Sequence, residues 1–371
     1  MTATSIPAIY SSDLAGVIVG ETAISDVQGE RGLLSYRGHP IETIAGRPPL
    51  QVAWLLVFGD WPSAEEEHRL GEFSALHRRL SASELAILRA LPRDLHPMLM
   101  LQSVIPTLAV PANGEAFGFS ADAAHGFAIA AKLPTLIAAW YRLRNGLDTM
   151  PSAGTLSPSD DFLRMLHGRV PTAAQLEVLD TAQILQMEHS FNAGTFAGRV
   201  CASTTAPLQS VIAVSVGTLF GALHGGADQA ALEMARRIGD PAQAQAYVRE
   251  CLREKIKIMG MGHREYKTVD PRARILKPMA AEHCIDAESR RLFNVLCAVE
   301  EACQREFAAQ GKQIWANVEF YKGAVFHSLG IPDDFFTAMF AMARVYGYVA
   351  HYLEFKPKAR LIRPRARYVG R

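Results

Sequence analysis

Three short segments each contain a histidine in a setting suited to acid–base chemistry. They are residues 188–192 (EHSFN), 221–226 (GALHGG) and 259–264 (MGMGHR), with His189, His224 and His263 as their histidines. Histidine is the side chain whose ordinary pKa lies nearest neutrality, so it can donate or accept a proton under physiological conditions. The three segments are therefore the first candidates for a catalytic or binding site.

The middle segment follows an apolar stretch that predicts a helix from Gln209 to Leu223. The Gly225–Gly226 pair then ends that helix, and its bare backbone lets a ligand approach closely. His224 is thereby placed at a helix boundary, where its surroundings are fixed. A core histidine bonded to a backbone carbonyl is the alternative interpretation of this residue.

The third segment predicts a flexible loop at Gly260–Gly262, whose backbone can lie against a planar ligand. His263, Lys267 and Arg272 follow it closely. Cationic and hydrogen-bonding side chains that gather after such a loop favour an anionic substrate. A solvated turn with a basic face is the alternative.

Metal ligation and thiol chemistry are rival uses of these residue types. The chain contains no HExxH motif and no His-x-His pair, so we predict no metal site. None of its cysteines falls within the three segments, which disfavours a cysteine nucleophile. Their odd number, five, and the absence of a CxxC pair favour free thiols in a reducing compartment.

The composition is that of a soluble globular protein, and the length is enough for one large domain and a smaller one. The chain has 371 residues, of which 49% are hydrophobic and 20% charged, and a formal net charge of +1. So small a net charge gives no reason to expect nucleic acid or an acidic membrane as a partner. No Lys or Arg precedes Arg31, and the uncharged stretch Val200–Leu223 is interrupted by Ser, Thr, Pro and Gln. We therefore expect a cytoplasmic protein with no membrane span.

The elements that must position the histidines are mainly helical. A β-hairpin closed by Gly29 is predicted within residues 17–36, and the helical period dominates afterwards. Capping residues predict helices from Pro241 toward Lys255 (capped by Asp240), from Asp286 to Gln310, and from Phe335 to Phe355. The Ser-, Pro- and Asp-rich stretch Thr155–Asp161 predicts a loop. The fold class is thus mainly α with a small N-terminal hairpin.

These three segments resemble the signature regions of the citrate synthase family, including 2-methylcitrate synthases, in its short bacterial and archaeal form. The resemblance extends to GETAISD at 20–26, YRG at 36–38, KLPT at 132–135, YR at 141–142 and the stretch 331–344. It implies a mostly helical homodimer with two domains in each subunit. The large domain would comprise residues 1–218 and 322–371, and the small domain residues 219–321. Closure of the small domain would exclude water from the cleft.

The resemblance also implies catalytic roles. His224, as a neutral imidazole, would hydrogen-bond the oxygen of an acyl-CoA thioester while Glu319 removes a proton from the neighbouring carbon. His263 would polarise and protonate the ketone of oxaloacetate. A thioester α-carbon is a weak acid, so its deprotonation needs this simultaneous stabilisation of the enolate oxygen.

Binding residues follow from the same resemblance. His189, Arg272 and Arg344 would hold oxaloacetate, and Arg363 would reach the site of the partner subunit. The loop formed by Ile258, Met259, Gly260, Met261 and Gly262 would receive the adenine of CoA, with Lys267 as a further contact. The CoA thioester is then a co-substrate, and no tightly bound cofactor is expected.

Two residues depart from the family pattern in the same short segment. Glu319 stands where the family usually has Asp, and Lys322 where it usually has a small residue. The first hypothesis is condensation of acetyl-CoA with oxaloacetate to citrate and CoA. The alternatives are a 2-methylcitrate or other alkylcitrate synthase that uses propionyl-CoA, and a catalytically silent homologue that binds a dicarboxylate or CoA.

Overall fold

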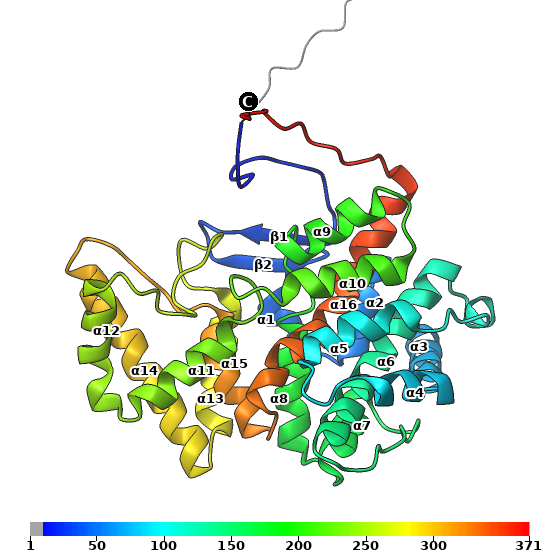
Figure 1. The fold of residues 1–371 in the computed structure, drawn as a ribbon, viewed down its shortest axis with the longest axis horizontal. Coiled ribbons are helices and arrows are strands. Elements are labelled where there is room, and N and C mark those ends of the chain that lie inside the picture. The colour runs from blue at the N-terminus through cyan, green and yellow to red at the C-terminus, as the bar shows by residue number, and fades with distance from the viewer. Residues whose placement is uncertain (1–9, 371) are drawn as a thin grey trace, which may run out of the picture.

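The computed structural model describes residues 10–370, and these form a mainly helical protein, as predicted (Figure 1). The α-helices are α1 Ile41–Ile44, α2 Pro49–Phe58, α3 Ala64–His77, α4 Ala82–Ala90, α5 Pro97–Val104, α6 Ala121–Arg144, α7 Pro158–His167, α8 Ala173–Ile184, α9 Ala193–Ala202, α10 Leu208–Leu219, α11 Ala227–Ile238, α12 Ala244–Arg253, α13 Pro271–His283, α14 Ala287–Ala308, α15 Val318–Ser328 and α16 Phe336–Phe355. Within residues 10–370, no helix is both long and apolar enough to cross a membrane.

The predicted hairpin is present, with a shorter first strand than the sequence suggested. Strand β1, Ser25–Gln28, pairs antiparallel with β2, Leu33–Tyr36, and the short β3, His39–Pro40, continues the sheet. Residues 17–24 form no strand. A Cβ at Gly29 would lie 2.2 Å from the backbone oxygen of Glu265, so only glycine allows the hairpin turn to pack against the segment that contains Glu265.

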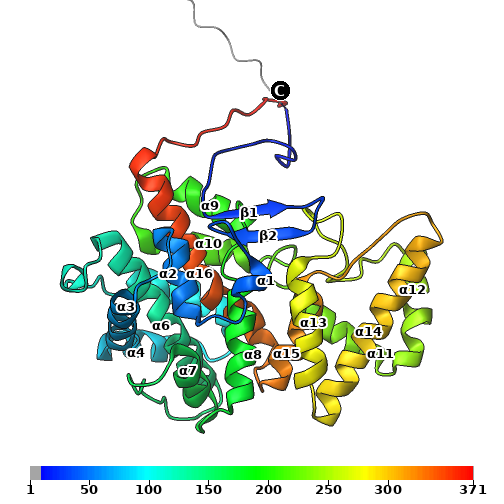
Figure 2. The same cartoon turned by 180° about the vertical axis from the view of Figure 1, so that it is seen from behind.

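Helices α6 and α16 pass through the centre of the larger group of helices (Figures 1 and 2). Both are buried around their whole circumference for most of their length, which is typical of central helices. Gly126 of α6 lies against Val349 of α16, where a Cβ would be 2.4 Å from a Val349 methyl. Helices α2, α8, α9 and α10 also pack on α16.

Helices α11 to α15 gather at one side of the molecule, on the left in Figure 1 and on the right in Figure 2. Among them, α15 packs on α11, α13 and α14, while α12 packs on α14. The chain leaves the larger group after α10 and returns to it with α16. The second and third histidine segments lie on this excursion, and their His224 and His263 contact Asn192 and His189, which lie between α8 and α9.

Helix boundaries confirm some predictions and correct others. Asp286 caps α14, and α16 ends at Phe355, both as expected. Asp240 caps a 3-10 turn, Pro241–Gln243, and α12 begins only after it. The predicted loop 155–161 is wrong in its second half, because Ser157 caps α7 and Pro158 is its first residue. The predicted end of α10 at Leu223 is also wrong, because the helix ends at Leu219.

Candidate active site

His224 lies in the turn that follows α10. The N–H of Gly225 donates to the carbonyl of Leu219 at 3.0 Å, which ends the helix earlier than predicted. A Cβ at Gly225 would lie 2.5 Å from that same carbonyl oxygen, so the turn requires glycine. The glycines therefore act through the shape of the turn, and this turn presents His224.

The proton on His224 can be assigned from its neighbour. Nε2 of His224 lies 3.2 Å from Oδ1 of Asn192. The Asn192 amide is oriented by its Nδ2, which donates to the Ser190 carbonyl and to Oγ1 of Thr195. Oδ1 must then be an acceptor, so Nε2 of His224 carries the hydrogen. Burial, with the charges of Arg344 and Lys322, lowers the pKa of His224 to about 4, so the ring is neutral at physiological pH.

His263 is neutral for similar reasons. The backbone N–H groups of Glu265 and Tyr266 donate to its Nδ1 at 3.0 and 3.2 Å, which leaves the hydrogen on Nε2. Burial and the neighbouring Arg272 lower the pKa of His263 to about 4. A neutral imidazole with a fixed Nε2–H is a hydrogen-bond donor suited to a carbonyl oxygen.

His189 lies beside His263, with ring centroids 5.3 Å apart. Its Nε2 is 3.1 Å from the hydroxyl of Tyr266, which sequence reasoning did not single out although it follows His263 by three residues. Burial, then the charge of Arg272, holds the pKa of His189 well below its usual range. His189, His263 and Tyr266 thus form one cluster of neutral hydrogen-bonding rings.

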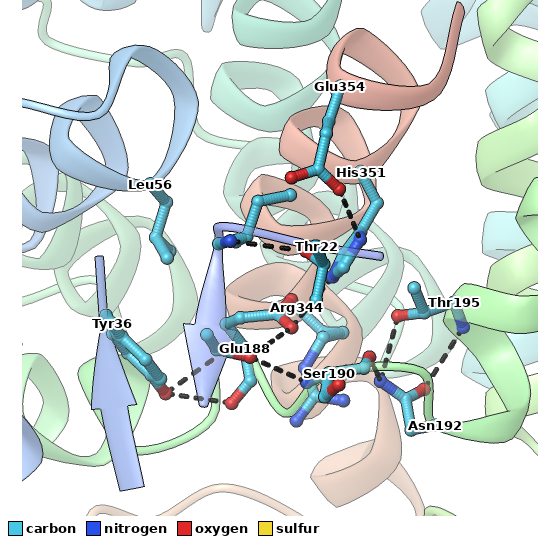
Figure 3. A network of polar contacts seen from close by, with 12 residues as sticks. Thr22, Tyr36, Leu56, Glu188, Ser190, Asn192, Thr195, Arg344, His351 and Glu354 are labelled. Atoms are coloured by element: carbon cyan, nitrogen blue, oxygen red, sulfur yellow. Dashed lines mark hydrogen bonds and ion pairs between the residues drawn. The ribbon is translucent and has the colours of Figure 1, made fainter. Parts of the chain in front are cut away.

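The segment before His189 is anchored to the hairpin and to α16 (Figure 3). The hydroxyl oxygen of Tyr36 lies 3.0 Å from the carbonyl oxygens of Ile184 and Glu188, and its one hydrogen can be donated to either. The Glu188 carboxylate accepts a hydrogen bond from Nε2 of His351 at 2.9 Å. Burial opposes ionisation of Glu188, yet His351 and Arg344 hold its pKa below the ordinary value. These contacts fix the backbone that presents His189.

The two arginines predicted to clamp a substrate have different surroundings. Arg272 is 3% exposed, and its guanidinium makes two hydrogen bonds to Asp270, at 3.0 and 2.8 Å. Arg344 is 1% exposed; its Nε donates to the carbonyl of Gln186 at 2.6 Å. Within residues 10–370, no carboxylate lies within 4.0 Å of Arg344, although its charge acts on the buried Glu188, which is paired with His351. A buried guanidinium without an ion-pair partner is suited to receive the carboxylate of a ligand.

Glu319 occupies the first turn of α15, where Asn317 caps the helix. It is 7% exposed, and its Oε2 accepts a hydrogen bond of 2.5 Å from Nζ of Lys322. The Asn317 amide donates to the carbonyl of Gly262 at 2.8 Å, which ties the start of α15 to the loop before His263. The carboxylate predicted as the base is therefore held close to the glycine loop and is already paired.

The loop Ile258–Gly262 lies against the segment before α15. Gly262 N–H donates to the carbonyl of Trp315, and Asn317 N–H donates to that of Gly260. Gly260 has φ of +79°, and a Cβ there would lie 2.8 Å from the ring of Phe320. Lys267 and His263 line an open pocket of about 210 Å³ that continues to Trp315. The last residue of the predicted ligand loop, Gly262, thus lies at the edge of this cavity.

The structure gathers most of the predicted site residues into two neighbouring sets. His189, His263 and Arg272 surround Tyr266. A second set surrounds the ring of Phe340, over which Lys322 and Arg344 lie at 4.2 and 4.7 Å, with the His224 ring 6.3 Å away. Phe340 was missed because an aromatic residue in an apolar helix gives no sequence signal of such a role.

Arg363 is not brought to this site within its own chain. It lies in the extended, exposed segment after α16, and its guanidinium donates to the carbonyl of Pro364 at 3.5 Å. The neighbouring Ile362 N–H donates to the hydroxyl of Ser203, after α9, at 3.1 Å. In Figure 1 this segment runs from the end of α16, at the right, to the top of the molecule above β1.

The known proteins that are similar to this chain are citrate synthases and 2-methylcitrate synthases. The family model described as "Citrate synthase, C-terminal domain" matches residues 13–365. A citrate synthase of Acidithiobacillus ferridurans is 38% identical, over 97% of this chain and 95% of its own. A 2-methylcitrate synthase of Shewanella oneidensis is 34% identical, over 98% and 95%. A solved citrate synthase from Thermoplasma acidophilum, in ternary complex with carboxymethyl coenzyme A and oxaloacetate, aligns with a TM-score of 0.88 at 28% identity, over 96% and 95%.

Proposed function

Because the chain belongs to the citrate synthase family, we propose that it condenses acetyl-CoA with oxaloacetate and hydrolyses the adduct to citrate and CoA. The observation that carries this proposal is the combination of two neutral, partly buried imidazoles, His224 and His263, with a buried arginine that has no carboxylate within 4.0 Å among residues 10–370. The imidazoles are hydrogen-bond donors for two carbonyl oxygens, and the arginine is a receptor for an anion.

The first step is deprotonation of the thioester carbon. Glu319 takes a proton from this carbon as the C–H bond breaks, and negative charge moves to the thioester oxygen. His224 stabilises that oxygen through its Nε2–H, for which the oxygen competes with Oδ1 of Asn192. A neutral donor suits this task, because its hydrogen bond stabilises the negative charge that develops on the oxygen without transferring the proton to it.

The second step forms the carbon–carbon bond. The nucleophilic carbon attacks the ketone carbon of oxaloacetate, while His263 donates its Nε2–H to the ketone oxygen. The fixed acceptor role of its Nδ1 supports this assignment. Arg344 and Arg272 hold the two carboxylates, and His189 contacts the keto acid. Hydrolysis of the thioester then releases CoA as its thiol.

The loop Ile258–Gly262 and Lys267 form the proposed CoA contact. The place of Gly262 and Lys267 in the lining of an open cavity supports this role. We further propose that residues 219–321 form a smaller domain that closes over the bound substrates. Helix α15 runs unbroken through the predicted boundary at 321/322, so we place the movable boundary at an end of this helix. The cytoplasmic location expected from the sequence stays a prediction.

A second candidate function is 2-methylcitrate synthesis from propionyl-CoA. The similar 2-methylcitrate synthase of Shewanella oneidensis favours it. A hydrophobic pocket separates two acyl chains that differ by one methylene by only about 1–3 kcal/mol. The choice between the two thioesters must therefore be measured.

Release of CoA thiol in the presence of oxaloacetate tests the proposal, with acetyl-CoA and propionyl-CoA compared at equal concentrations. We expect turnover with both and a higher kcat/KM for acetyl-CoA. Glu319→Gln is expected to abolish turnover and to leave oxaloacetate binding intact. Absence of thiol release from both thioesters would support the silent binding homologue, and full activity of Glu319→Gln would contradict the assigned base.

We also propose a homodimer in which Arg363 completes the site of the partner subunit. The exposure of Arg363 and its lack of contact with its own site residues support this arrangement. Mixing two impaired variants, His224→Ala and Arg363→Ala, at an oxaloacetate concentration where neither alone has appreciable activity, tests it. If Arg363 acts across the interface, half of the dimers carry one complete site, and activity returns to about a quarter of the wild-type value. If it acts within its own subunit, mixing restores nothing.

A further inference from the structure

The base assigned above belongs to a buried cluster of three charged groups. Nζ of Lys322 donates to Oε2 of Glu319 at 2.5 Å and to Oε1 of Gln186 at 3.0 Å. Oδ2 of Asp228, in the first turn of α11, lies 3.1 Å from the same nitrogen. Lys322 and Asp228 are both 0% exposed. The ring of Phe340 covers the ammonium at 4.2 Å. Such a charge cluster is costly to bury, so its presence calls for a role.

The two carboxylates are not bound to Lys322 in the same way. The contact with Glu319 is a hydrogen bond, whereas Oδ2 of Asp228 is close enough for an ion pair but makes no hydrogen bond with any of residues 10–370. An ammonium has three hydrogens, of which Glu319 and Gln186 take two. Lys322 can therefore strengthen its contact with Asp228 by a small rotation of its end group.

The charge balance of the cluster explains why Lys322 contacts two carboxylates. With both carboxylates ionised, the cluster has a net charge of −1. When Glu319 takes the proton from the thioester carbon, its carboxyl becomes neutral, and Lys322 with Asp228 remains as a neutral ion pair. Without Asp228, the same step would leave an isolated ammonium in a buried site, which is strongly unfavourable.

The geometry also explains why a glutamate serves here. Residues 319 and 322 are three positions apart on α15, so their side chains lie on the same face of the helix. Aspartate is shorter by one methylene, about 1.5 Å, and this difference would carry its carboxylate out of hydrogen-bond reach of Lys322. The pair holds Oε2, while Oε1 accepts no hydrogen bond from any described residue and is free to receive the proton.

We propose that Lys322 and Asp228 are positioning residues for the base: Lys322 aims the Glu319 carboxylate, and Asp228 receives the ammonium when Glu319 becomes protonated. The inference rests on the proposed function, since it takes Glu319 as the base. Other charges face this site as well. The charge of Arg272, on α13, lowers the pKa of Glu319. The guanidinium of Arg344, on α16, lies over the ring of Phe340, which Lys322 also contacts.

The pH dependence of kcat/KM for the acyl-CoA separates the two roles. Burial raises the pKa of Glu319, Lys322 opposes this effect and Asp228 adds to it. Lys322→Met should therefore move the acidic limb of the profile to higher pH, and Asp228→Asn should move it to lower pH. In both variants kcat should fall by about 10- to 100-fold, because the carboxylate is misplaced or less basic. Oxaloacetate binding should remain.

A double-mutant cycle tests the aiming role independently. In a Glu319→Asp background the carboxylate no longer reaches Lys322, so Lys322→Met should reduce kcat by a smaller factor than in the wild type. Lys132→Met is the matched control, because Lys132 forms a buried ion pair with Glu84 at 2.7 Å on α6 and α4. This control should reduce stability without moving the acidic limb.

Each outcome has a defined meaning. Opposite shifts in the two variants, with non-additive losses in kcat, support the proposal. If the acidic limb does not move in either variant, or moves in the same direction in both, the positioning role is wrong. If Glu319→Gln is nevertheless inactive, the proposed function is retained without it. Activity in Glu319→Gln would overturn both. If Lys322→Met fails to fold, Asp228→Asn decides the question, because it keeps the Lys322–Glu319 pair intact.

Discussion

Replacing each of the two buried arginines by methionine should separate structural stability from substrate binding. Arg272 and Arg344 are almost equally buried, 3% and 1% exposed, and both are proposed to hold oxaloacetate. Only Arg272 is already paired with a carboxylate, that of Asp270. The two substitutions therefore leave very different structures behind, although they remove the same chemical group.

The magnitudes follow from what each substitution leaves unpaired. In Arg272→Met, the buried Asp270 keeps its hydrogen bond from Val318 N–H but loses its counter-ion. Breaking a buried ion pair in this way costs about 3–5 kcal/mol of unfolding free energy. In Arg344→Met, the hydrogen bond to the Gln186 carbonyl is lost, and the buried Glu188 loses the favourable charge of Arg344 but keeps its ion pair with His351. The net loss should be about 1–2 kcal/mol, smaller than that of Arg272→Met.

Binding should respond alike in both variants. Loss of a charge-assisted hydrogen bond to a carboxylate costs about 1.5–3 kcal/mol, which weakens oxaloacetate binding about 10- to 100-fold. Urea unfolding of the ligand-free protein measures the first effect, at one fixed protein concentration because the proposed dimer would make apparent stability depend on concentration. The stabilisation produced by added oxaloacetate measures the second. Equal destabilisation by the two substitutions, without oxaloacetate, would refute the reasoning.

Three further predictions concern the loop, the histidines and the tail. Gly260→Ala should cost about 2 kcal/mol or more of stability and raise KM for the acyl-CoA, because φ is +79° and the new Cβ would lie 2.8 Å from Phe320; an unchanged KM would contradict the role of the loop. Burial lowers the pKa of His224 and His263 from 6.5 to about 4, so the unfolded state binds more protons between these values. The free energy of unfolding should therefore be highest above about pH 6.5 and should fall toward pH 4 by up to about 3 kcal/mol per histidine. Urea midpoints that stay constant over this pH range would contradict the lowered histidine pKa. Arg363→Ala should leave the unfolding midpoint unchanged because the side chain is exposed, while kcat/KM for oxaloacetate falls at least about tenfold; a shifted midpoint with normal kinetics would show a structural role instead.

Several elements could be predicted because their signals are local. Asp286 caps α14 with its own carboxylate, and Leu33–Tyr36 pairs across a short turn, so neighbouring residues determine both elements. The end of α10 could not be predicted in the same way. It depends on a hydrogen bond that Gly225 makes back to Leu219, and a loop conformation of this kind is not encoded in an apolar pattern.

The sequence by itself determined the fold class and which residue types could supply the chemistry, because helical periodicity and the Gly–His segments are visible along the chain. Only the tertiary structure decided the protonation and the ion pairing of those residues. It makes His224 neutral, pairs Arg272 but not Arg344 with a carboxylate, and places the Glu319 carboxylate on Lys322. Protonation and pairing depend on burial and on charges distant in sequence, such as Asp228 beside Lys322, and these exist only once the chain is folded.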